Sequence, residues 1–373
     1  MWFTNDIKAL NDACLDSLLK LARVSIDAEP PQRFSRSILG LLGDKAQGLK
    51  KTLPWRNLMP EREHRRFVKS IVSQLDEGLQ RAPIDYFEGP WRAGNQLLAM
   101  LEGASIDERT YDDIVSSGTG NKWAVETFKP EHGVALATSY DRFGALTGRL
   151  TVQSGPSILT LKKEHRSMLR SSFEGGSIVS IDFNALEARV LLYEAGRRCD
   201  GDDLYGQLVQ ELGFDRKAIK AAVICELYGA SKQSLGTALG IDGNELTTFI
   251  KAVKMHFNTD ELLKRIKATF IARGEILNRY GRPVVVDEPM DHIMLNYYAQ
   301  SSGVDVALMG FKIIMDRLRS DEKRNVRALY VLHDALIIDV PPERTDDVRS
   351  IRTVNVPGYV QRFCLKHEIL TQR

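Results

Sequence analysis

Two stripes of apolar residues predict helices in the first third of the chain. In the first stripe, Ile7, Leu10, Cys14, Leu18 and Leu21 recur every three or four residues, as on the apolar face of an amphipathic helix. A second stripe repeats every four residues over 67–79. Proline-containing segments between the stripes are typical of breaks. We therefore expect residues 1–130 to be mainly helical.

After residue 130 the pattern changes to short apolar strands alternating with helices. Ser177–Phe183 follows a glycine pair, contains β-branched residues and predicts a strand, with a helix over 185–195. The apolar runs 328–332 and 335–340 meet at His333-Asp334, which predicts a tight hairpin.

Helical periodicity dominates the region between these strands. A helix is expected over 215–227 with Asp215 as its N-cap, and the helical pattern continues to 273 with an interruption near 240–243. A turn at 280–283 and a strand at 284–286 come next, followed by another helix. Residues 116–122 lack the spacing of a phosphate-binding loop and predict a linker at a domain boundary.

Composition indicates an ordinary globular protein. The 373 residues are 43% hydrophobic and 27% charged, with a net charge of +2, and their number suggests two or three structural units. The four cysteines form no CxxC pair, which argues against a zinc site or a disulfide framework. With no apolar run of about 18 residues and no signal-peptide pattern, we expect a cytoplasmic protein with no membrane association.

Two aspartates at the ends of apolar strands are the strongest candidates for chemistry. Asp182 ends one strand and Asp334 lies at the tip of the predicted hairpin. A carboxylate beside so much apolar sequence must be paired, protonated or bound to a cation, and two of them could hold a pair of Mg²⁺ ions. The alternative is that each aspartate simply ends its strand in a turn.

Two rows of polar residues lie at helical spacing. Arg216, Lys220, Ile224 and Tyr228 are four residues apart, a stripe along which a nucleotide could lie with its phosphates at the cationic end. The second row continues this spacing and consists of His292, Asn296 and Gln300. Uncharged polar donors in a row can bind a nucleic-acid backbone or minor-groove edge. Each row could equally be an ordinary solvated helix face.

Taken together and in this order, these sets resemble the family A DNA polymerases, the group of bacterial DNA polymerase I, over about residues 139–340. Residues 139–150 are similar to the family's SYH…TGRL segment, and 182–189 resemble motif A, DYSQIELR. Residues 216–229 resemble motif B, RxxxKxxxxxxxYG, and His333-Asp334 matches motif C.

The resemblance implies roles at the reaction centre. Asp182 and Asp334 would bind two Mg²⁺ ions together with the backbone carbonyl of Phe183. Arg216 and Lys220 would contact the triphosphate, and Lys220 is a candidate proton donor to the leaving group.

It also implies nucleotide and DNA contacts. Glu187 would crowd a ribose 2′-hydroxyl as a steric gate and pair with Tyr228, which would occupy the template-base position before closure. The implied DNA contacts are Arg149 at the primer terminus, Asn296 and Gln300 along the primer-template, and His333 and His292 at phosphates.

Three positions depart from the family pattern. Ile224 stands where an aromatic ring packs on the incoming sugar, Ala335 replaces the motif C glutamate, and His292 replaces an arginine. The aliphatic Val223 and Ile224 are similar to motif B of single-subunit phage RNA polymerases. Glu187 argues against that group, which carries a small residue at this position.

We therefore expect an α+β, right-hand polymerase fold with an antiparallel palm sheet. The predicted parts are a helical N-terminal, thumb-like region (1–130), a first palm segment (131–196), helical fingers (197–273), and a second palm segment with a C-terminal tail (274–373).

The predicted function is primer extension with dNTPs on a DNA template, in DNA replication, without proofreading because residues 1–130 show no carboxylate pattern of an exonuclease. The alternatives are an RNA polymerase or primase on the same scaffold, and a non-catalytic binding module. We expect a monomer that binds primer-template DNA and dNTPs, with replisome proteins as candidate partners, and its length suggests a phage or mobile-element source.

Overall fold

The computed structural model describes residues 13–24, 60–118, 122–199, 201, 203–228, 232–319 and 326–373. The chain divides into two compact units, Met1–Phe87 and Glu88–Arg373. The predicted linker at 116–122 falls within the second unit, and its residues 119–121 lie outside the described part of the chain.

The described part of the first unit is helical. It consists of α1 (Ala13–Ala22), α5 (Glu61–Arg81) and α6 (Ile84–Tyr86). Helix α5 buries Phe67 and Ile71 from the predicted apolar stripe. A Cβ on Gly78 of α5 would lie 3.0 Å from the side chain of Leu19, so the missing side chain lets α1 approach closely. The first predicted stripe is described only from residue 13 onward.

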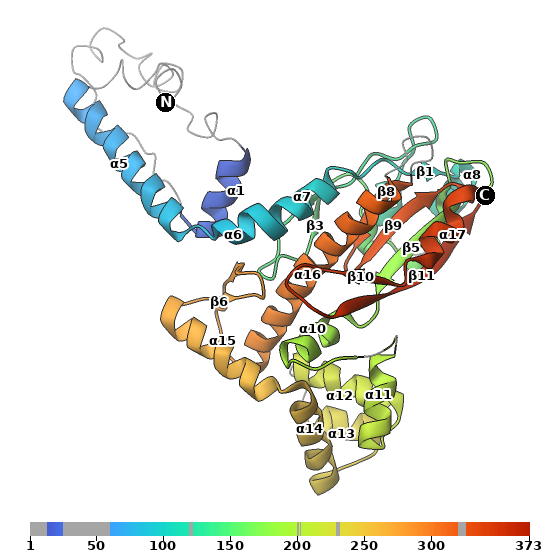
Figure 1. Cartoon of the computed structure of the whole chain (residues 1–373). Helices are drawn as coiled ribbons and strands as arrows, with labels where there is room; N and C mark the ends of the chain where they lie inside the picture. The colour runs from blue at the N-terminus through green and yellow to red at the C-terminus, as the bar shows by residue number, and fades with distance from the viewer. Residues whose placement is uncertain are drawn as a thin grey trace. The chain divides into compact units, whose positions relative to one another are not determined.

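A five-stranded antiparallel sheet is the centre of the second unit (Figure 1). Its strands, in spatial order, are β10 (Thr353–Asn355), β11 (Arg362–Gln372), β5 (Ser177–Phe183), β9 (Ala335–Val340) and β8 (Arg327–Leu332). Strand β5 therefore lies between β11 and β9. Three two-stranded pairs accompany this sheet: β1 (Ser105–Ile106) with β4 (Leu169–Arg170), β2 (Ser139–Asp141) with β3 (Thr151–Ser154), and β6 (Ile276–Leu277) with β7 (Pro283–Val284).

Helices make up most of the remaining described chain. Those before β5 are the π-helical turn η3 (Phe87–Trp91), α7 (Arg92–Leu98), α8 (Glu108–Ser117), α9 (Lys122–Glu126), and the 3₁₀ turns η4 (Ile158–Thr160) and η5 (Lys163–Met168). Those after β5 are α10 (Leu186–Glu194), α11 (Leu204–Leu212), α12 (Arg216–Tyr228), α13 (Lys232–Leu239), α14 (Gly243–Phe257), α15 (Thr259–Arg273), α16 (Asp291–Leu318), η6 (Pro342–Arg344) and α17 (Thr345–Ser350).

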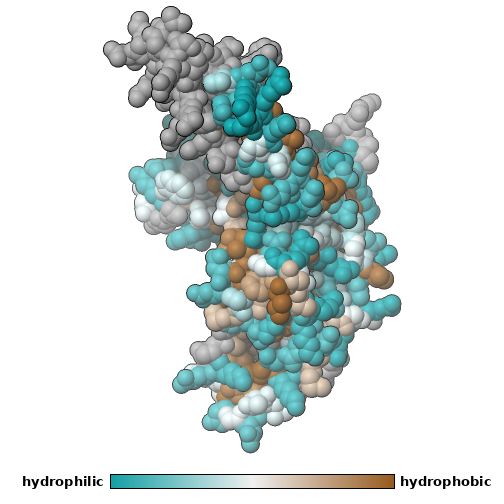
Figure 2. Space-filling model, turned by 90° about the vertical axis from the view of Figure 1, so that its left-hand side faces the viewer, coloured by the Kyte–Doolittle hydropathy of each residue, from teal (hydrophilic) through white to brown (hydrophobic). Residues whose placement is uncertain are grey.

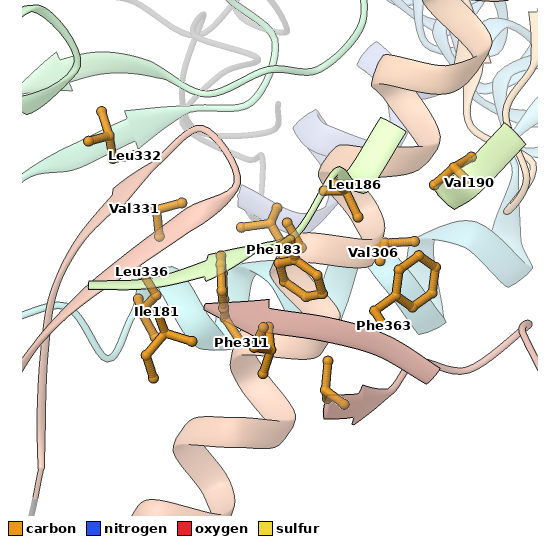
Figure 3. Close-up of a cluster of buried hydrophobic side chains, with 14 of the residues drawn as sticks. Ile181, Phe183, Leu186, Val190, Val306, Phe311, Val331, Leu332, Leu336 and Phe363 are labelled. Carbon is orange, nitrogen blue, oxygen red and sulfur yellow. The ribbon is translucent and has the colours of Figure 1, made fainter. Parts of the chain in front are cut away.

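The core lies between one face of the sheet and the 28-residue helix α16. The ring of Phe183 on β5 packs against Phe311 of α16, with centroids 5.1 Å apart, and against Phe363 of β11 (Figure 3). Side chains alternate across a strand, so Asp182 projects from the opposite face to Phe183. Helix packing on one face of β5 thus holds Asp182 on the other.

Most predicted elements are confirmed. Strands β5, β8 and β9 and helices α10, α12 and α16 lie where the pattern placed them. The side chain of Asp215 accepts hydrogen bonds from the backbone N–H groups of Lys217 and Ala218, as expected for an N-cap.

One prediction about the last hundred residues was wrong, and one strand there was not predicted. The predicted strand at 284–286 is limited to the short β7, Pro283–Val284. The predicted C-terminal tail contains β11, an 11-residue strand that pairs with β5. The tail is therefore part of the main sheet.

Hydrophilic residues cover much of the face shown in Figure 2, and hydrophobic residues form patches among them. Among the helices that the structure describes, none combines the length and apolarity needed to cross a membrane.

Candidate active site

The two candidate aspartates lie at one end of the main sheet. In the β5–β9 pairing Asp182 is opposite Ala335, the residue after Asp334. The backbone N–H of Phe183 donates to the carbonyl of Asp334 at 3.0 Å. Register and hydrogen bonding therefore place two residues that are far apart in the sequence beside each other.

Local backbone geometry positions the residues around this pair. His333 adopts a left-handed φ of 55° at the tip of the β8–β9 hairpin, as a two-residue turn requires. Ala185 is also left-handed, with φ 54° and ψ 49°, and turns the chain from β5 into α10, which carries Glu187. Such conformations are uncommon outside glycine; one occurs next to Asp334 and the other three residues after Asp182.

Tyr140 of β2 holds the strand that leads to Asp334. Its hydroxyl donates to the carbonyl of Val331 at 2.8 Å and accepts from the Val331 N–H at 3.1 Å. Burial raises the pKa of this phenol, so it stays protonated and can donate. Although Tyr140 belongs to the quoted 139–150 segment, no role was predicted for it.

The electrostatics of the aspartate pair are unfavourable for two bare carboxylates. Burial, followed by the charge of Asp334, raises the pKa of Asp182 to about 7. Burial also raises the pKa of Asp334, and the charge of Glu187 contributes in the same direction. Oδ1 of Asp182 is buried and has no hydrogen-bond partner among the described residues. A divalent cation would satisfy that oxygen and neutralise the repulsion, so this pair fits a metal site.

A cavity of about 290 Å³ adjoins Asp334. Its walls include six of the predicted site residues: Arg149, Glu187, Ile224, Gln300, His333 and Asp334. At the wall of this cavity, Nη2 of Arg149 donates to Oε1 of Glu187 at 2.6 Å. The structure thus gathers residues from the 139–150 segment, motifs A, B and C, and α16 around one space.

The cationic end of α12 lies outside this wall. Arg216 forms an ion pair with Asp203 at 3.2 Å and lies over the ring of Tyr205, 5.5 Å from its centroid. Tyr205, which sequence reasoning missed, itself lines the cavity. Lys220 is exposed on α12. The side chain of Tyr228 is outside the described part of the chain, so its predicted pairing with Glu187 stays a prediction.

The predicted row on α16 is divided between two places. Gln300 lines the cavity, and Oδ1 of Asn296, one turn earlier, is buried with no hydrogen-bond partner among the described residues. His292 lines a separate cavity of about 260 Å³ together with Lys232 and Lys254. The structure therefore does not bring His292 to the cavity of Asp334.

Comparison with known proteins gives the family. The model of DNA polymerase family A matches residues 122–357, well over half of the chain. The thermostable DNA polymerase I of Thermus filiformis is 24% identical over 247 residues, or 58% of this chain and 29% of the relative. A DNA polymerase of Mycobacterium phage L5 is 30% identical over 139 residues, or 35% of this chain and 23% of the relative. The chain belongs to DNA polymerase family A.

The fold agrees with this assignment. The structure superposes with a TM-score of 0.62 on the POL domain of Pol1 from M. smegmatis, which was solved in complex with DNA primer-template and dNTP. The match covers 95% of this chain and 80% of that domain at 16% identity. The expected α+β polymerase fold with an antiparallel sheet is confirmed. The chain nevertheless spans less than a third of the length of the two relatives named above.

Proposed function

We propose that this chain is a DNA-directed DNA polymerase that extends a primer with dNTPs. The observation that carries the proposal is the placement of Asp182 and Asp334 beside each other at the end of the sheet of a family A fold. In the proposed reaction the primer 3′-hydroxyl loses its proton to solvent water, and its oxygen bonds to the α-phosphorus of the dNTP. The bond between the α-phosphorus and its bridging oxygen to the β-phosphate breaks, and pyrophosphate leaves.

Asp182, Asp334 and the backbone carbonyl of Phe183 are the proposed ligands of two Mg²⁺ ions. When bound, Mg²⁺ supplies charge stabilisation for in-line phosphoryl transfer. Within the described residues, no third His, Cys, Asp or Glu side chain completes a metal-ligand cluster with the two aspartates. We infer that water and nucleotide phosphates provide the remaining ligands.

The cations of α12 are proposed to bind the triphosphate. Arg216 is exposed and held by an equally exposed carboxylate, an arrangement with a small net free energy, so a polyphosphate can displace Asp203. Lys220 is proposed to donate a proton to the departing pyrophosphate. Triphosphate binding and proton donation both require accessible side chains, and Arg216 and Lys220 are exposed.

Sugar selection is proposed to depend on Glu187. Arg149 holds this carboxylate at the cavity wall, where it would crowd a ribose 2′-hydroxyl. Ile224 contributes an aliphatic surface to the same wall and is 41% exposed. Arg149, Asn296, Gln300 and His333 are proposed to contact the primer-template, and His292 a phosphate further along it.

We also propose a domain organisation for the chain. Residues 131–196 and 274–373 would form the palm, 197–273 the fingers, and 1–130 a thumb-like region. The chain would extend a primer without excising mismatched ends.

Primer extension tests the function directly. The purified chain is incubated with a primed DNA template, Mg²⁺ and either dNTPs or rNTPs. We expect extension with dNTPs and little with rNTPs, and a mismatched primer end should remain uncut. A clear preference for rNTPs would contradict the assignment and support the RNA polymerase alternative, which gains no support from the comparisons. Absence of extension with both would contradict polymerase activity.

A further inference from the structure

Strand β11 brings an additional cation to Asp182. In the β11–β5 pairing, Lys366 is directly opposite Asp182. Directly opposed residues of an antiparallel pair project from the same face, with Cβ atoms about 4.5–5.5 Å apart. Since β5 lies between β11 and β9, Lys366 is on one side of Asp182 and Ala335 is on the other.

The charge of Lys366 is available to a ligand. Its side chain is exposed, and no residue in the described part of the chain forms an ion pair with it. Glu368, two residues further along β11, is instead held by Lys163 at 2.6 Å. Lys366 and Asp182 are not in salt-bridge contact, although the lysine charge lowers the pKa of Asp182. The ammonium group is therefore close to the carboxylate of Asp182, the proposed metal ligand, but does not form an ion pair with it.

The position favours a phosphate as the ligand. An ammonium on a flexible four-carbon stem is a strong point-charge partner for phosphate oxygens. A polyphosphate bound through cations at Asp182 would bring such oxygens within reach of the opposing strand. The negatively charged polyphosphate would then interact with Lys366 on β11 as well as with the cations of α12.

The arrangement of the sheet indicates whether Lys366 contacts a phosphate of the primer or one of the nucleotide. The cavity and His333, a proposed contact of the primer-template, lie on the Asp334 side of Asp182. Lys366 lies on the other side. We propose, on the basis of the polymerase function above, that Lys366 is a further phosphate-binding residue that contacts the pyrophosphate portion of the nucleotide.

Calorimetric titration with inorganic pyrophosphate in buffer containing Mg²⁺ tests this without requiring catalysis. The full-length wild type is compared with Lys366→Ala, Lys366→Arg and Lys129→Ala. Lys129 is an exposed lysine in the turn after α9 and controls for the loss of one surface charge. We expect the Kd of pyrophosphate to rise about tenfold in Lys366→Ala, as for loss of one charge-assisted contact, and to change less than about threefold in Lys366→Arg. Lys129→Ala should match the wild type.

Primer-template affinity, measured in parallel, separates a nucleotide contact from a DNA contact. It should be the same in Lys366→Ala and the wild type, and the thermal midpoint should also be unchanged because the side chain is exposed. The proposal is overturned if Lys366→Ala binds pyrophosphate normally, if it loses only DNA affinity, or if the wild type does not bind pyrophosphate. Primer extension by the wild type reports separately on the polymerase function, so failure of the Lys366 contact leaves that result intact.

Discussion

At the scale of a single residue, Asp182 shows how a buried carboxylate lowers the stability of the metal-free folded protein. Burial and the neighbouring Asp334 raise its pKa from an ordinary 3.8 to about 7. The folded protein therefore retains a proton at Asp182 between about pH 4 and 7 that the unfolded chain has released. Stability falls as pH rises through this window, because the folded state binds more protons than the unfolded state.

Asp182→Asn should therefore stabilise the metal-free protein at pH 8. The asparagine cannot ionise, so it removes a penalty on the order of 2 kcal/mol after allowance for partial solvent screening. At pH 4, where the aspartate is protonated in the folded state, the variant and the wild type should unfold at similar temperatures. Thermal unfolding in the presence of a chelator at both pH values measures the difference. Asp287→Asn, at an exposed position before α16, is the control, and an equal gain in that variant would contradict the explanation.

At the scale of elements, local pattern predicted the strands and helices that carry most of the site. The β-branched run of β5, the two apolar runs of β8 and β9, and the helical rows of α12 and α16 are all local signals. Strand β11 was missed because polar residues interrupt its apolar ones and its register shifts between Ile369 and Thr371. Strand β11 forms because it pairs with β5, which is distant in the sequence, and the local pattern of residues does not reveal this pairing. Lys366 consequently had no predicted role.

Two glycines of α16 give opposite expectations for the same substitution. A Cβ on Gly310 would lie 2.7 Å from Cζ of Phe183, whose ring is confined by Phe311 and Phe363. A Cβ on Gly303 would make only ordinary contacts, the nearest at 3.6 Å to Leu186. Gly310→Ala should lower the free energy of unfolding by about 1–2 kcal/mol through overpacking. Gly303→Ala should raise it by about 0.5–1 kcal/mol through helix propensity.

Urea denaturation of both variants measures these changes. Stabilisation by Gly310→Ala would contradict the close packing of α16 against Phe183 of β5. The same substitution in the same helix controls for propensity, so only the packing against Phe183 distinguishes the pair.

At the scale of the whole second unit, a buried polar network joins segments that are distant in the sequence. Arg142 stacks on Trp91 at 3.9 Å from the ring centroid and donates to its carbonyl at 2.6 Å. It also pairs with Asp305 of α16 at 3.5 Å, and Asp305 accepts from Asn278 at 2.7 Å. Sequence pattern does not reveal this network, because its charged members are buried only after the segments assemble.

Removing one charge of the network should be strongly destabilising. Arg142→Met removes one ion-pair partner of the fully buried Asp305 and should lower the free energy of unfolding by about 3–5 kcal/mol. Adding Asp305→Asn should recover part of this loss because it removes the buried negative charge that Arg142 offset. Lys122→Met breaks an exposed pair with Glu126 and should change stability by less than about 1 kcal/mol. Urea denaturation compares the three, and a loss below about 1 kcal/mol in Arg142→Met would contradict this role.

The proposed chemistry depends on the two carboxylates of Asp182 and Asp334 acting together. Single-turnover primer extension with dNTPs and Mg²⁺, combined with measurement of primer-template affinity, tests this most directly in the wild type, Asp182→Asn and Asp334→Asn. Each variant should bind the primer-template with the affinity of the wild type and extend it at less than about 1% of the wild-type rate, a loss of roughly 3 kcal/mol in transition-state stabilisation. Extension well above that level by either variant, with DNA binding intact, would contradict the assignment of the active site.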